Sequence, residues 1–202
     1  APSPKPPPPT PYRGLGGEFE EKLVAQASRL CSSGPHLKSD LPSPGSSRGK
    51  DPIRIVLDSR LRLPLTARLL HLESAAPTWV ACTPGAPKEK IKALKKLGVE
   101  VLVLPQESAE SSRVALKPLL ELLGKRQVQS LLVEGGAETL GAFFDQRLVD
   151  KFYFFYAPKF LGGQDAPGVL GGQGFNHLKD APQAKGLTLS RLGPDILISG
   201  YL

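Results

Sequence analysis

The stretch SLLVEGGAETLGAFFDQRLVDKFYFFYAPKFLGG, residues 130–163, carries the clearest indication of the fold. Its first five residues form a short apolar run that is typical of a buried strand, and apolar residues recur at helical spacing over residues 137–147. Two adjacent glycines, Gly135 and Gly136, separate these segments. A second run rich in aromatic residues, at 151–157, predicts another strand. Strand, glycine turn, helix and strand in this order predict an α/β unit.

The same alternation extends toward the N-terminus. Short β-rich runs at 53–58, 78–82 and 99–104 predict further strands, and helical patterns lie at 88–97 and 113–125. Strands that alternate with helices of this length predict a mostly parallel sheet flanked by helices on both faces. Residues 187–202 differ, because two strand-like runs flank a Gly-Pro-Asp turn at 193–195. They predict an antiparallel hairpin at a sheet edge.

The first 50 residues have a different composition, so we divide the chain into residues 1–50 and an α/β domain at 51–202. The opening 14 residues are rich in proline, which disfavours helices and central strands, and they predict an extended tail. Within residues 17–30, Phe19, Leu23, Val24 and Ala27 predict one amphipathic helix. Residues 31–50 return to the composition of a loop.

Composition excludes several classes of protein. The 26 Lys and Arg residues exceed the 19 Asp and Glu residues to give a net charge of +7, but the basic residues are scattered, which disfavours a nucleic-acid partner. No apolar run is long enough to span a membrane. The two cysteines, Cys31 and Cys82, form no C-x-x-C motif, and the three histidines are far apart, so we expect no metal site. We expect a soluble, cytoplasmic protein.

The glycine pair suggests a ligand. Between a strand and a helix, Gly135 and Gly136 lie where unpaired backbone N–H groups and the helix dipole favour an anion such as phosphate. Without Cβ atoms, the glycines allow close approach and positive φ angles. Glu134, at the carboxyl end of the strand, could orient a substrate. A tight structural connection is the alternative, since the full G-x-G-x-x-G pattern is absent.

Three segments carry a resemblance to a known family. IRIVLDSRLRLPLTARLL (53–70), the stretch 130–163 and LGPDILISGYL (192–202) resemble, in this order, the reductase domain of the bifunctional riboflavin-biosynthesis deaminase–reductase. The resemblance covers residues 51–202. It implies a dihydrofolate-reductase-like fold, NADPH as cofactor and a homodimer. It also implies the reduction of 5-amino-6-(5-phosphoribosylamino)uracil, in which the ribosyl group becomes a ribityl chain.

The resemblance also assigns roles to residues. Glu134 falls on a position that contacts the substrate. Arg60 could supply charge for the 2′-phosphate of NADPH, and a structural ion pair with Asp58 is the alternative. Cofactor binding falls on Ser59 and on the glycine loop with the following helix: Gly135, Gly136, Ala137, Glu138, Thr139, Leu140, Gly141 and Ala142.

The segment CSSGPHLKSD, residues 31–40, departs from the family pattern. Leu37 aligns with a residue that binds substrate, but Ser33 replaces the catalytic Asp and Asp40 replaces the Arg that binds the substrate phosphate. A serine lacks the carboxylate charge, and Asp40 would repel a phosphate. The catalytic residue is therefore unknown. Three explanations remain open: a truncated or frameshifted reductase, a nucleotide-binding relative without turnover, or residues supplied by another subunit.

The deaminase activity of the bifunctional enzyme has no support in this sequence. Zinc-dependent deaminases of this kind need a P-C-x-x-C motif in addition to H-x-E. The chain contains no P-C-x-x-C sequence. We therefore expect reductase chemistry alone.

The glycine loop leads to a first prediction. Replacing Gly136 with Val should weaken NADPH binding by about tenfold or more, because a branched side chain would occupy the space that a phosphate needs. Titration of the nicotinamide fluorescence measures this affinity. Unchanged affinity in Gly136→Val would show that the phosphate binds elsewhere.

Overall fold

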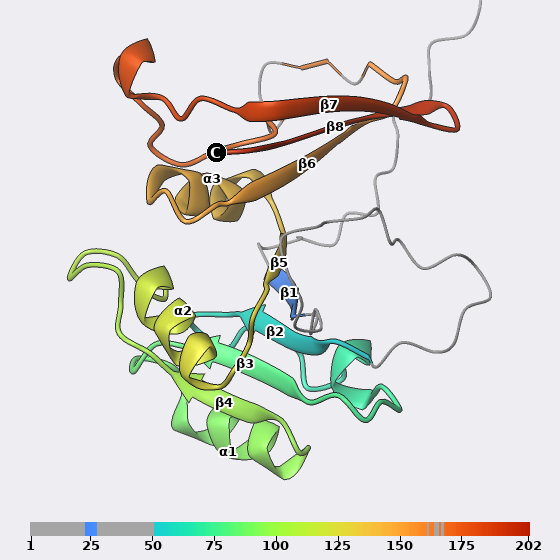
Figure 1. The fold of residues 1–202 in the computed structure, drawn as a ribbon. Helices are drawn as coiled ribbons and strands as arrows, with labels where there is room; N and C mark the ends of the chain where they lie inside the picture. Colours follow the sequence, from blue (N-terminus) through green and yellow to red (C-terminus); the bar gives the residue numbers. More distant parts are fainter. Residues whose placement is uncertain (1–22, 28–50, 161, 164–165, 167) are drawn as a thin grey trace, which may run out of the picture.

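The computed structural model describes residues 23–27, 51–160, 162–163, 166 and 168–202, and these form two sheets and three α-helices (Figure 1). The first sheet has the strand order β4 (Glu100–Val103), β3 (Thr78–Cys82), β2 (Ile53–Leu57), β1 (Leu23–Ala27) and β5 (Leu132–Glu134). The second has the order β6 (Lys151–Tyr156), β8 (Asp195–Tyr201) and β7 (Lys185–Leu192). Two short 3-10 helices, η1 (Arg68–His71) and η2 (Leu178–Asp180), lie in connections. The α/β class expected from the sequence is confirmed.

The first sheet is mostly parallel. Strand β3 pairs in parallel with β2 on one side and β4 on the other. Strand β1 pairs antiparallel with both β2 and β5, so β5 runs in the same direction as β2. The carboxyl ends of β2, β3, β4 and β5 therefore meet at one edge of the sheet, which is the edge where open α/β sheets bind ligands.

Strand β1 corrects one expectation. Residues 17–30 were expected to form an amphipathic helix, but Leu23–Ala27 is a strand between β2 and β5. Without it, two neighbouring strands would each leave a row of backbone donors and acceptors unpaired. Pairing on both sides satisfies those groups and outweighs a local helical pattern, because propensity is a weak determinant beside tertiary contacts. Part of the chain before residue 51 thus belongs to the sheet.

Helices cover both faces of the first sheet, as expected. Along the buried strands successive side chains point to opposite faces, and each face has its own core. Ile55, Trp79 and Leu102 pack with α2 (Leu116–Lys125) and with Phe143 of α3 (Ala137–Asp145). Val56 and Val80 pack on the other face with Leu94 of α1 (Lys88–Lys96). Ile55, Val56, Val80 and Leu94 are fully buried.

The second sheet differs in part from expectation. The hairpin expected at 187–202 is present as β7 and β8, with Gly193 at φ 60° in the turn. However, β6 does not extend the parallel sheet, because it pairs antiparallel with β8 in the separate sheet. Helix α3 links the two sheets: Phe143 packs into the first core, while Phe144 stacks on Phe154 of β6 with ring centroids 6.3 Å apart.

Within the ranges that the structure describes, no helix has the length and apolar character that crossing a membrane requires.

Candidate functional site

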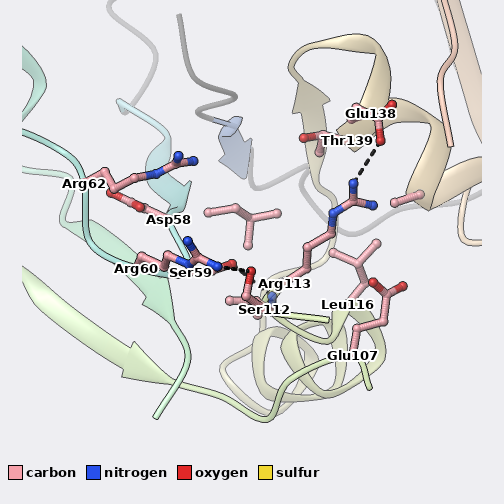
Figure 2. Close-up of a pocket in the computed structure, with 13 residues that line it drawn as sticks. Asp58, Ser59, Arg60, Arg62, Glu107, Ser112, Arg113, Leu116, Glu138 and Thr139 are labelled. Carbon is pink, nitrogen blue, oxygen red and sulfur yellow. Dashed lines mark hydrogen bonds and ion pairs between the residues drawn. The ribbon is translucent and has the colours of Figure 1, made fainter. Parts of the chain in front are cut away.

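A pocket of about 260 Å³ lies at the carboxyl-end edge of the parallel strands (Figure 2). Three segments that are distant in sequence line it: residues 57–62 at the end of β2 and after it, residues 107–116 before and at the start of α2, and one face of the first turns of α3. The α3 residues are Glu138, Thr139 and Ala142. The site therefore depends on the sheet to bring these segments together.

Asp58 and Ser59, which form the corner after β2 and line the pocket, are held in place by hydrogen bonds. The carboxylate of Asp58 accepts a hydrogen bond from the backbone N–H of Leu63 at 2.6 Å. The Ser59 carbonyl accepts bonds from both the N–H and the hydroxyl of Thr83, at 3.1 and 3.0 Å. The Ser59 hydroxyl oxygen accepts the backbone N–H of Val114 at 3.1 Å. The corner thus connects the end of β2 with the segments after β3 and before α2.

Asp58 is nearly fully buried, and Cys82 at the end of β3 is fully buried. Burial, and then the nearby charge of Asp58, raises the pKa of the Cys82 thiol. A buried thiol with a raised pKa remains protonated and unreactive at neutral pH. Cys82 therefore has a packing role in the core rather than a role as a nucleophile.

Three arginines line the pocket, namely Arg60, Arg62 and Arg113. The Arg60 guanidinium donates to the Ser112 hydroxyl at 3.1 Å, which leaves the alternative pairing with Asp58 without a contact to support it. Arg113 forms an ion pair with Glu138 across the pocket, with Nη2 and Oε2 2.9 Å apart. Figure 2 shows Arg62 beside Asp58 and the Arg113 side chain extending to α3.

The glycine loop leads directly into α3. Gly136 is the N-cap of this helix, with φ −72° and ψ 169°, and it has no side chain with which to cap the first turn. The first N–H groups of the helix consequently lack intrahelical partners and can hold an anion. Neither Gly135 nor Gly136 uses the positive φ region that glycine allows. If glycine is required at these positions, the reason is the room for a ligand that the missing side chain leaves at the helix N-terminus.

Gly141 contacts another part of the chain instead of the pocket. It is buried within α3, and a Cβ atom at this position would overlap the backbone carbonyl of Gly171. The Gly171 N–H donates to the Ala137 carbonyl at 2.8 Å. The Asp145 carboxylate accepts the N–H groups of Gln173 and Gly174, at 2.7 and 3.0 Å. Residues 171–174 thus form a strap that is fixed along α3.

The structure brings together some of the predicted cofactor residues. Ser59, Glu138, Thr139 and Ala142 line the pocket. Glu134, Gly135 and Gly136 are exposed beside it, whereas Ala137, Leu140 and Gly141 are half-buried or buried away from its lining. Ser33 and Leu37 lie outside the described residues.

Sequence reasoning missed the loop before α2. Glu107, Ser112 and Arg113 line the pocket, yet the first two stand in a polar segment without a motif, and Arg113 was expected as the first residue of a helix. Their position depends on the backbone bonds of Glu107 with Arg113 and of Ala115 with Pro105, at 2.9 Å each. A polar loop between a strand and a helix gives no local signal of where it folds.

The described residues contain no cluster of three or more His, Cys, Asp or Glu side chains that could hold a metal ion. His71 and Glu73 have the H-x-E spacing, but His71 Nε2 lies 2.7 Å from the Leu65 carbonyl in the loop after β2. This histidine therefore has a structural contact.

A pocket with three arginines in its lining lies at the carboxyl ends of parallel strands and beside a helix N-terminus, which is where open α/β domains bind phosphorylated ligands. The sequence model of the RibD C-terminal domain matches residues 22–198, and the chain belongs to this family. The match includes β1, which lies before the segment that carried the resemblance. The matched range also contains the glycine loop and all three α-helices.

Individual relatives agree with this assignment. The riboflavin biosynthesis protein RibD of Bacillus amyloliquefaciens is 32% identical over 179 residues, which cover 89% of this chain and 46% of that protein. The 2,5-diamino-6-ribosylamino-4(3H)-pyrimidinone 5′-phosphate reductase of Archaeoglobus fulgidus is 39% identical over 153 residues, which cover 76% of this chain and 65% of that protein. The chain thus spans about half to two thirds of the length of these relatives.

A solved structure has a similar fold. The structure of Acinetobacter baumannii RibD superposes with a TM-score of 0.57 and 27% identity, covering 76% of this chain and 38% of that one. The similarity shows that this chain shares its fold with part of that RibD chain.

The strap along α3 generates a prediction. Gly141→Ala should lower the free energy of unfolding by about 1–3 kcal/mol, because the added methyl group overlaps the Gly171 backbone and the packing must open. Gly124→Ala is the matched control, since this helical glycine of α2 has open space around its Cβ position. It should stabilise the protein by about 0.4–1 kcal/mol. Urea unfolding measures both, and equal effects would show that the strap does not pack on α3 as described.

Proposed function

We propose that this chain is an NADPH-dependent reductase that converts the ribosyl group of 5-amino-6-(5-phosphoribosylamino)uracil to a ribityl group in riboflavin biosynthesis. One observation carries the proposal. Ser59 and three residues of α3, all assigned to the cofactor from sequence, are about 80 positions apart and line the same pocket. The name of the Archaeoglobus relative supports the reaction class, because it describes a reductase of a 2,5-diamino-6-ribosylamino-pyrimidinone phosphate, which differs from the aminouracil by an amino group in place of an oxygen.

The residues of the pocket fit the phosphorylated adenosine end of NADPH. A volume of about 260 Å³ is below the roughly 300–1,000 Å³ of pockets that enclose a drug-sized ligand, so it suits part of a dinucleotide. Arginines are the preferred partners of phosphate groups, and Arg60 and Arg113 both line the pocket. The Ser59 hydroxyl oxygen accepts from Val114, so its own proton can be donated to a ligand oxygen.

The glycine loop fits a second phosphate contact. The N–H groups at the start of α3 and the positive end of its dipole favour an anion. Gly135 and Gly136 keep this end of the helix accessible, since both are exposed and neither has a side chain. Bound NADPH would supply a hydride, and the role of this chain would be to fix its orientation.

The remaining assignments concern the substrate and the assembly. Glu134 is exposed at the carboxyl end of β5, where it could orient the aminouracil, and Leu37 would add a further contact. A homodimer is supported by the apolar surface of the second sheet, where Leu187, Leu189 and Phe155 are between 61% and 71% exposed. A cytoplasmic location fits the composition.

A nucleotide-binding protein without turnover is the second candidate. It is favoured by the sequence of residues 31–40, where Ser33 and Asp40 replace a catalytic Asp and a phosphate-binding Arg. The proposed reductase would then need another carboxylate, and Glu134 is the candidate that lies nearest to the glycine loop in sequence.

One experiment tests the proposal in two stages. NADPH is titrated into the full chain and followed by nicotinamide fluorescence, and the aminouracil ribosyl phosphate is then added while NADPH oxidation is recorded. The proposal predicts binding, with NADPH preferred to NADH, and then substrate-dependent oxidation. Binding without oxidation would support the second candidate. Absence of NADPH binding would overturn both.

A further inference from the structure

The charges that line the pocket balance one another. The three arginines face three carboxylates: Asp58, Glu107 and Glu138. An anionic ligand therefore meets a lining with no formal excess of positive charge. Of the three arginines, Arg113 is held by a carboxylate, so its charge becomes fully available to a phosphate only when it exchanges that partner for the ligand.

The three carboxylates differ in what they contact. Asp58 is buried and accepts the Leu63 N–H, while Glu107 accepts the Gln146 amide at 2.9 Å and the Ser111 hydroxyl at 3.4 Å. Glu138 instead pairs with an arginine, Arg113, at 2.9 Å. The side chains of this pair are 54% and 46% exposed. An ion pair with this exposure is screened by water and contributes little net stability, so it opens at small cost.

The position of the pair connects it to the ligand. Arg113 belongs to the loop before α2, and its guanidinium crosses to the first turn of α3 (Figure 2). Glu138 is the acidic residue of that turn. A phosphate at the N-terminus of α3 would thus lie beside the guanidinium that Glu138 holds. Phosphate also offers arginine a stronger, bidentate partner than an exposed carboxylate.

We propose that Glu138 is an internal competitor for the ligand phosphate: it holds Arg113 until a phosphate of the dinucleotide displaces it and takes over the guanidinium. Arg113 is then a phosphate-binding residue, and Glu138 sets how tightly the phosphate binds. This inference rests on the proposed function, because it names the partner of a residue in the same pocket. It assigns Glu138 a role opposite to that of a direct cofactor ligand.

The sign of the effect of one substitution tests the proposal. In the full chain, Glu138→Gln should tighten NADPH binding by about twofold to fivefold, because it releases Arg113 from an exposed ion pair. Arg113→Gln should weaken it by about tenfold or more, because a charge-assisted bond to phosphate is lost. The probes are NADPH, followed by nicotinamide fluorescence, and inorganic pyrophosphate, followed by calorimetry.

Two controls separate competition from simpler effects. Glu107→Gln removes the same charge from the lining but releases no arginine, so it should change affinity less than Glu138→Gln. The double variant Arg113→Gln/Glu138→Gln should bind NADPH no more tightly than Arg113→Gln alone, because no arginine remains for Glu138 to hold. Tightening that persists there would mean that Glu138 repels the phosphate directly, and the proposal would be wrong.

The remaining outcomes also decide the matter. Weaker NADPH binding in Glu138→Gln would overturn the inference, because it would show that Glu138 positions Arg113 or contacts the cofactor itself. If the unsubstituted protein binds pyrophosphate with the predicted order among variants but does not bind NADPH, the inference holds and the proposed function fails. If it binds neither probe, both fail.

Discussion

The fold and the candidate site both depend on the corner formed by Asp58 and Ser59. Here the chain leaves a buried parallel strand, and these two residues accept four hydrogen bonds, which Leu63, Thr83 and Val114 donate. A buried carboxylate or carbonyl costs free energy unless it accepts hydrogen bonds, so these bonds allow the corner to be buried. They also hold the loop that carries Arg113 against the end of β2.

Helix α3 connects the pocket with both sheets of the molecule. One of its faces contributes Phe143 to the core of the parallel sheet, and Phe144 stacks on the second sheet. The strap at 171–174 is fixed along it by Asp145 and by close packing at Gly141. The first turn of the helix is therefore held at the pocket by contacts on several sides. A helix fixed in this way presents its N–H groups in a constant direction, which favours recognition of a phosphate.

Much of this could be predicted from the sequence, and the exceptions share a physical cause. Strands β2 to β5 and helices α1 to α3 have strong periodicity and fall close to the expected residues. Strand β1 was expected to be helical from the spacing of its apolar residues. The segment is a strand instead, because the helical pattern of five residues is too weak to oppose pairing with two neighbouring strands. Gly141 was assigned to the cofactor, although the structure places it against Gly171. Arg113 had no local signal, since its role arises from the folded position of a polar loop.

The central claim is that three distant segments form one dinucleotide-binding site. Hydrogen–deuterium exchange of the full chain, with and without NADPH, tests it most directly, because a ligand slows the exchange of amides whose opening it opposes. The account predicts slower exchange together in residues 58–63, 112–116 and 136–142. Protection confined to one of these segments, or located in the β7–β8 hairpin, would contradict it.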